Sequence, residues 1–141
     1  MAEAIARHHI ARGLLGGEDR VFVASAGIQA PDDTPTTPET IDSLSRLGID
    51  FEGHSKRLSE QMIRKADLIL CMSAAQQAAA RALVPDSPAD QEKIMLLNPD
   101  GDIEDPIGMG QDAYDALSRA LMKLIPTRLS EALSQVANES R

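Results

Sequence analysis

Cysteine and aromatic residues are scarce in this 141-residue chain. Its one cysteine, Cys71, excludes an intramolecular disulfide framework and any cysteine-clustered zinc or iron–sulfur site, and such usage is typical of a reducing cytoplasm. The aromatic residues are Phe22, Phe51 and Tyr114. The core must therefore be built from Leu, Ile, Val, Ala and Met, and platforms for stacking single-stranded nucleic acid are missing.

Basic residues are also fewer than acidic residues. The 14 Lys and Arg residues face 22 Asp and Glu residues, which gives a net charge of −8. No broad cationic face is expected, so binding to nucleic acid or to an anionic membrane is not predicted. Charged residues interrupt positions 1–15, which excludes a secretory signal or a membrane span there.

The hydrophobic pattern alternates between helix and strand, as is typical of an α/β domain with a mostly parallel sheet. One domain over residues 1–141 is predicted, because two would not fit this length comfortably. Helices are expected at 2–15, 38–47, 59–65, 73–83 and from 111 onward, with a kink or restart at Pro126, and strands at 21–24, 68–72 and 94–97; residues 85–90 are expected to be a loop.

An acidic segment follows the third predicted strand, at the end of the sheet where α/β domains bind ligands. Residues 100–105 contain four carboxylates, Asp100, Asp102, Glu104 and Asp105. A solvated loop, a general acid/base site and a cation site are all compatible with this composition, although the glycine is misplaced for a calcium loop. No metal or cofactor site is predicted, because His8 and His9 diverge by about 100° on a helix and His54 has no second ligand in view.

Several segments, in order and spacing, resemble the low-molecular-weight protein-tyrosine-phosphatase family, which also includes related arsenate reductases. The segments that carry the resemblance are Met1-Ala2-Glu3-Ala4-Ile5, Ala24-Ser25-Ala26-Gly27, Leu47-Gly48-Ile49-Asp50, Gly53-His54-Ser55-Lys56-Arg57, Ala66–Met72 and Ile103-Glu104-Asp105-Pro106-Ile107-Gly108. The resemblance implies a three-layer α/β/α fold of the phosphotyrosine phosphatase I type.

The resemblance also implies catalysis by a loop in which five residues separate a cysteine from an arginine, and that loop is absent from these 141 residues. Cys71 does not replace its cysteine, because the matching position is Gln77 and an apolar strand is a poor setting for a thiolate. We therefore expect a catalytically inactive relative that serves as a binding or regulatory module. The alternative is an N-terminally truncated form of an active cysteine-dependent phosphotyrosine phosphatase.

Two residues match site positions of the family. Asp105 corresponds to the general acid, which protonates the leaving oxygen, but without a nucleophile it is equally well interpreted as a remnant or as a loop residue that bonds backbone amides. Ile107 stands at a cleft-wall position where family members often carry an aromatic residue.

The family resemblance also implies that a central first strand is missing between the strands at 21–25 and 68–72. Removing it leaves a gap of about 10 Å, twice the strand spacing of ~4.8 Å, across which backbone groups cannot pair. The strands could close up, a second copy could fill the gap, or another chain could donate a strand. A rearranged sheet is expected, with a homodimer or a strand-donating protein as partner, and a phosphorylated molecule as candidate ligand.

Overall fold

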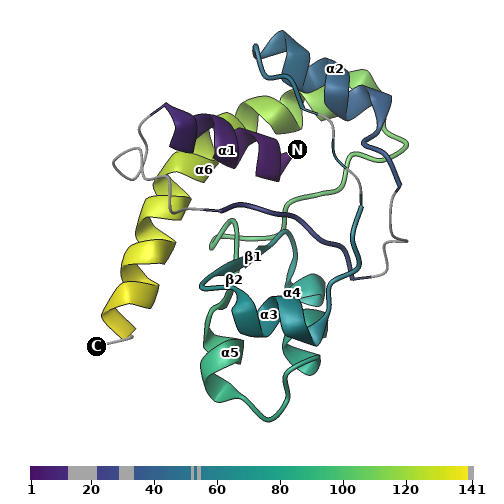
Figure 1. Ribbon diagram of the computed structural model, residues 1–141. Coiled ribbons are helices and arrows are strands. Elements are labelled where there is room, and N and C mark those ends of the chain that lie inside the picture. Colours follow the sequence, from purple (N-terminus) through teal and green to yellow (C-terminus); the bar gives the residue numbers. More distant parts are fainter. Residues whose placement is uncertain (13–21, 29–33, 52, 54, 140–141) are drawn as a thin grey trace.

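The predicted α/β fold is confirmed by the computed structural model, which describes residues 1–12, 22–28, 34–51, 53 and 55–139 (Figure 1). Val21 and His54 lie outside these ranges. The elements in chain order are α1 (Ala2–Ala11), α2 (Pro38–Arg46), α3 (Glu60–Lys65), β1 (Ile69–Cys71), α4 (Ala74–Ala82), α5 (Pro88–Glu92), β2 (Ile94–Leu96) and α6 (Gln111–Glu139). α6 continues through Pro126 as one helix.

Hydroxyl side chains fix where the shorter helices begin. Ser59 accepts a hydrogen bond from Met62 N at 3.2 Å, and Ser73 accepts one from Gln76 N at the same distance. Each bond satisfies an amide that has no partner within the first turn. The predicted loop at 85–90 is wrong in part, because Ser87 caps α5 and Pro88 occupies its first turn.

The sheet is short and parallel. Leu70 of β1 is in register with Met95 of β2, and these two strands form the two-stranded sheet of the described residues. The apolar runs at 68–72 and 94–97 thus form strands, as predicted. Residues 22–26 do not, although a strand was predicted at 21–24.

Contacts with other parts of the chain hold the 22–28 segment. The carbonyl of Val23 accepts two hydrogen bonds from the Arg7 guanidinium, at 2.7 and 3.1 Å. At the other end, Gly27 forms an isolated parallel bridge with Arg57. Direct pairing of this segment with β1, one of the three outcomes considered above, is therefore not found among the described residues.

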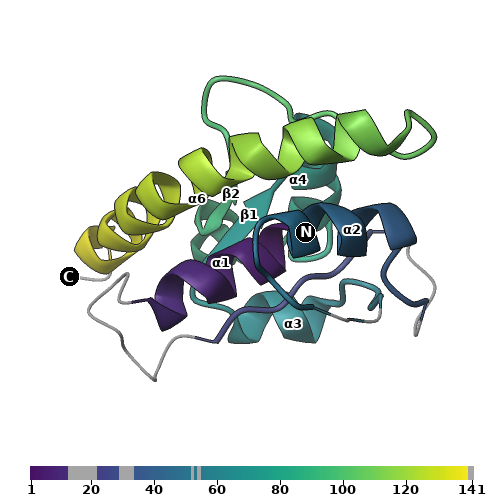
Figure 2. The same ribbon diagram turned by 90° about the horizontal axis from the view of Figure 1, so that it is seen from above.

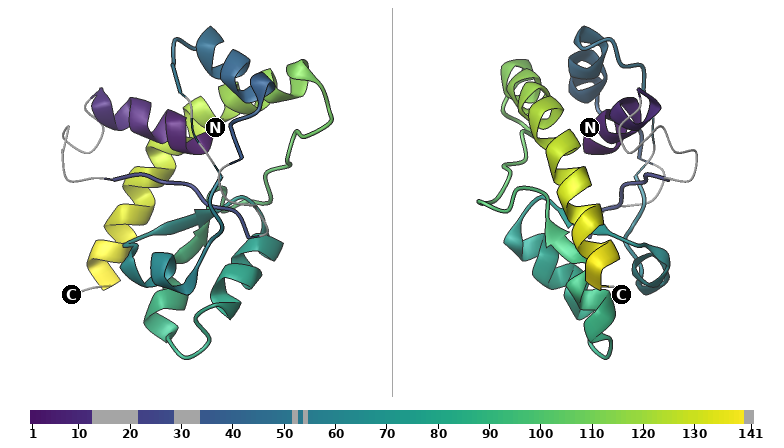
Figure 3. Two further views of the ribbon diagram at one scale, coloured as in Figure 1. Left: turned by 45° about the vertical axis from the view of Figure 1, so that its right-hand side comes forward. Right: turned by 90° about the vertical axis from the view of Figure 1, so that its left-hand side faces the viewer.

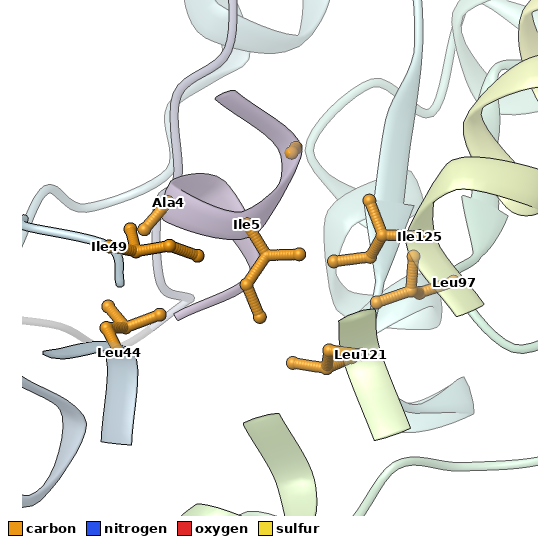
Figure 4. Packing of buried hydrophobic residues seen from close by; sticks show 8 residues of the cluster. Ala4, Ile5, Leu44, Ile49, Leu97, Leu121 and Ile125 are labelled. Carbon is orange, nitrogen blue, oxygen red and sulfur yellow. The ribbon is translucent and has the colours of Figure 1, made fainter. Parts of the chain in front are cut away.

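Two apolar clusters cover the two faces of the sheet. Buried residues of α1, α2 and α6 dominate the first, the α1–α6 cluster, which consists of Ala4, Ile5, Ala6, Leu44, Ile49, Leu97, Leu121 and Ile125 (Figure 4). The second, the α3–α4 cluster, consists of Ile63, Cys71, Ala80, Val84 and Ile94. Figures 1 and 3 show α1 and α2 on one side of the strands and α3, α4 and α5 on the other, and Figure 2 looks down from the side of α1 and α2. The layers are thus those of an α/β/α domain.

The helices of the described ranges include none that is both long and apolar enough to cross a lipid bilayer. The longest, α6, carries polar and charged residues along its 29 positions.

Candidate functional site

The acidic segment 100–105 packs against the end of β1. Ile103 N donates to Met72 O at 2.7 Å, and the Asp102 carboxylate accepts from Ala74 N, the first amide of α4, at 2.8 Å. A carboxylate at this position satisfies a free amide and complements the positive end of the helix dipole. Asp102 therefore has a structural contact, and the interpretation of 100–105 as only a solvated loop is incomplete.

Asp105 lies in a tight turn at the surface. Its Oδ1 accepts a hydrogen bond from Ile107 N at 3.1 Å, while Pro106 is buried between these two exposed residues. The turn closes when Met109 N donates to Pro106 O at 2.9 Å, and Gly108 adopts a φ of 76°, which suits glycine. The carboxylate bonds a loop amide in this structure, and its role as a general acid stays a prediction.

Apolar side chains project from the same turn. Ile107 is 69% exposed and Met109 is 54% exposed. The assignment of Ile107 to the wall of a substrate cleft stays a prediction.

Cys71 lies inside the protein. Its residue surface is 8% exposed and it packs within the α3–α4 cluster beside residues such as Ile63 and Val84. Burial raises the pKa of the Cys71 thiol, and the nearby positive charge of Arg81 opposes this shift only in part. No residue of the acidic segment 100–105 belongs to the α3–α4 cluster. Cys71 therefore lies in an apolar cluster, whereas Asp105 lies in an exposed turn.

A polar network joins α2 to α6, and sequence reasoning missed it. Ser43 Oγ donates to Asp115 Oδ1 at 2.6 Å, Gln111 Nε2 donates to the same oxygen at 3.1 Å, and Arg46 forms an ion pair with Asp115. The hydrogen bond from Ser43, followed by that from Gln111, lowers the pKa of the Asp115 carboxyl. Because Ser43 and Asp115 are 72 residues apart, no local pattern could reveal the pair.

A hollow of about 320 Å³ lies between α1 and the turn after α2. Arg7, His8, Asp50 and Phe51 are among its lining residues. Arg7 is already bonded to Val23 O and paired with Glu3, and burial is the main cause that lowers the pKa of His8. Among these lining residues, the Arg7 guanidinium is therefore engaged in contacts within the fold. In the part of the chain that the structure describes, no group of three or more His, Cys, Asp and Glu side chains is placed to hold a metal ion.

Comparison with known proteins identifies relatives of this chain. The sequence model of the low molecular weight phosphotyrosine protein phosphatase family matches residues 1–141. A probable low molecular weight protein-tyrosine-phosphatase, EpsP of Ralstonia solanacearum, is 32% identical over 100 residues, which are 70% of this chain and 68% of EpsP.

Solved structures of phosphatases also resemble this chain in fold. A mutant of the arginine phosphatase YwlE, in which serine replaces cysteine and the active site serine is phosphorylated, superposes with a TM-score of 0.79. It is 27% identical, and the superposition covers 94% of this chain and 86% of that one. A low molecular weight protein tyrosine phosphatase from T. tengcongensis is 30% identical, with a TM-score of 0.76 and coverage of 92% and 87%.

Proposed function

Since this chain belongs to the low molecular weight phosphotyrosine protein phosphatase family, we propose that its 141 residues act as a phosphatase-like binding module without catalysis of their own. Cysteine-dependent phosphatases need an accessible thiolate that attacks phosphorus and an arginine that holds the phosphoryl oxygens. The one cysteine of these residues, Cys71, is buried in β1. This burial is the observation that carries the proposal.

The chemistry around Cys71 supports the same conclusion. A raised thiol pKa reduces the thiolate fraction at neutral pH, and an apolar cluster cannot stabilise the charge of a phosphoryl group. The five residues after Cys71 are followed by Gln77, whose side-chain amide donates to Ile94 O at 3.0 Å. The Gln77 side chain is therefore bonded to the backbone of β2, and it carries no positive charge with which to hold a phosphoryl group. A single reduced, buried cysteine also fits a cytoplasmic module.

Hydrolysis of para-nitrophenyl phosphate by the purified 141-residue chain tests this proposal. We expect no turnover above the uncatalysed rate, with or without orthovanadate, and no change for Asp105→Asn. A rate that vanadate inhibits and that Cys71→Ser abolishes, in a variant with an unchanged circular dichroism spectrum, would refute it.

A second candidate function is that of an active phosphate monoester hydrolase, in which residues that precede Met1 in a longer protein supply the cysteine and the arginine. The exposed Asp105 turn favours this alternative, because the position that matches the general acid is reachable from solvent. The codons upstream of Met1 discriminate the two: an in-frame cysteine followed after five residues by arginine favours hydrolysis, and a stop codon favours the module.

If such codons exist, the extended chain should be assayed on phosphotyrosine and phosphoarginine peptides, because the relatives include a tyrosine phosphatase and an arginine phosphatase. Loss of turnover on Asp105→Asn, with Asp102→Asn as the matched control on the same segment, would assign the general acid.

A further inference from the structure

Side chains occupy the outer edge of β2, the edge that faces away from β1. Leu97 N donates to Cys71 O at 2.8 Å, so Leu97 directs its backbone groups to β1. Successive residues of a strand direct these groups to opposite edges. The backbone groups of Leu96, and with them those of Ile94, therefore face the outer edge, and no strand of the described ranges lies beside it.

Three long side chains donate hydrogen bonds to the carbonyl oxygens of this edge. Gln77 Nε2 and Arg81 Nη2 both donate to Ile94 O, each at 3.0 Å. Arg128 Nε and Nη2 both donate to Leu96 O, at 3.0 and 2.8 Å. Because a carbonyl oxygen has two lone pairs, each of these oxygens has its whole acceptor capacity in use.

The donors reach the edge from both faces of the sheet. Gln77 and Arg81 are one turn apart on α4, on the side of the α3–α4 cluster. Arg128 belongs to α6, on the side of the α1–α6 cluster, and Figure 3 shows the C-terminal half of α6 passing the strands. Two helices that pack on opposite faces thus meet at one edge of β2.

The two arginines have no carboxylate partner. Arg128 is 9% exposed and Arg81 is partly buried, yet neither forms an ion pair within the part of the chain that the structure describes. The chain has 22 Asp and Glu residues with which they could pair. A charged donor forms a stronger hydrogen bond to a backbone oxygen than a neutral donor does. Their position therefore favours a role at the strand edge over a role in ion pairing.

β2 itself carries none of the usual protection of an edge strand. Residues 94–97 are Ile, Met, Leu and Leu, without a charged residue or a proline. An apolar edge of this kind is prone to pair with the same edge of a second copy, since a two-fold axis brings the two strands together antiparallel. Protection must therefore come from residues outside the strand.

We propose that Gln77, Arg81 and Arg128 close the outer edge of β2 and so prevent it from pairing with a second copy of this chain. An incoming strand needs free acceptors at alternate residues, and this edge offers Ile94 O and Leu96 O. A continuous ladder cannot form while both oxygens are occupied. The proposal goes beyond the binding role given above, and it does not depend on what lies beside the far edge of β1.

Sedimentation velocity of Arg128→Met beside the parent chain tests the proposal. Methionine keeps an unbranched apolar stem but removes both donors to Leu96 O. We expect a sedimenting mass that rises with concentration and an association constant at least about tenfold above that of the parent chain. Arg119→Met is the matched control, because Arg119 is exposed on the same helix and its loss changes the net charge equally. It should leave association unchanged.

Amide hydrogen exchange by NMR locates the contact. The N–H of Leu96 faces the outer edge, so pairing there should slow its exchange at least about tenfold in the associated variant relative to the dilute monomer. If Arg128 contributed to stability alone, Arg128→Met would exchange faster and without dependence on protein concentration. Arg128→Lys keeps a charged donor and should associate less than Arg128→Met.

A double variant tests the other half of the edge. Gln77→Met combined with Arg81→Met frees Ile94 O while Arg128 still occupies Leu96 O, and it should also associate. This variant decides the matter if the circular dichroism spectrum shows that Arg128→Met does not fold.

Three results would overturn the proposal. One is a folded variant, Arg128→Met or the double variant, that sediments like the parent chain. Another is association without slower exchange at Leu96, which would place the contact elsewhere. The third is loss of folding in both variants, which would make these side chains necessary for the fold itself. None of these results depends on phosphatase turnover, so failure here and failure of the proposed function are separable.

Discussion

The burial of Cys71, the one cysteine of these 141 residues, leads to a quantitative prediction about stability. Cys71 packs against Ile63, Ala80, Val84 and Ile94, each 0% exposed. Cys71→Ser keeps the shape of the side chain but places a hydroxyl among these apolar groups. A buried hydroxyl without a partner costs about 1–3 kcal/mol. For a domain of this size, about 3 °C per kcal/mol gives a fall in Tm of about 3–10 °C.

The assay compares Cys71→Ser with Cys71→Ala in urea unfolding followed by circular dichroism. Serine should be the less stable variant, although it is the larger residue, because alanine leaves only a small cavity. Ala75→Ser on the exposed face of α4 is the matched control, and it should change the free energy of unfolding by less than about 0.5 kcal/mol.

Thiol chemistry provides an independent measurement on the unmutated chain. Burial and a raised pKa should make alkylation of Cys71 by iodoacetamide at pH 7 much slower than that of a cysteine peptide, and urea should restore the rate. A Cys71→Ser variant as stable as the parent chain, together with a folded thiol that reacts as fast as the peptide, would contradict the burial of Cys71.

Three further predictions concern the framework. Ile5→Ala should lower the free energy of unfolding by about 2–5 kcal/mol, because Ile5 is 0% exposed in the α1–α6 cluster; urea titration measures this, and a loss below about 1 kcal/mol would contradict the packing. Asp102→Ala should cost about 0.5–2 kcal/mol through the lost bond to the first amide of α4, whereas Asp100→Ala should cost less; equal losses would contradict that role. Because the folded pKa of Asp115 is lowered, its stabilising contribution is present above the ordinary value of 3.8 and is lost as pH falls below it; Asp115→Asn should therefore flatten acid unfolding between pH 5 and about 2, and an unchanged slope would refute the assignment.

Local signals explain why most of the helices and both strands were predictable. Thr37, Pro38 and Glu39 supply a cap, a fixed φ and a favourable charge within three residues, and α2 begins at Pro38. The apolar runs at 68–72 and 94–97 are too short for helices and are flanked by polar residues, and both form strands. Such elements depend on neighbouring residues that the sequence displays directly.

Contacts between distant residues were not predictable from the chain alone. The hydrogen bond from Ala74 N to Asp102 gives the acidic segment a structural role, yet the two residues are 28 positions apart. Residues 22–26 have the composition of a strand, but a strand requires a partner at strand spacing, and neither β1 nor β2 pairs with them. Apolar composition therefore predicts an extended segment without predicting its partner.

By itself, the sequence determined the order of helices and strands, the family of the chain and the presence of a single thiol. These properties follow from residue type and spacing along the chain. The apolar run around this thiol also indicated that it is buried, and the structure confirms it. Only the tertiary structure decided that Asp102 bonds the start of α4 and that Ser43 and Gln111 bond Asp115. Burial and hydrogen bonding depend on groups that folding brings together from distant positions, and local spacing carries no record of them.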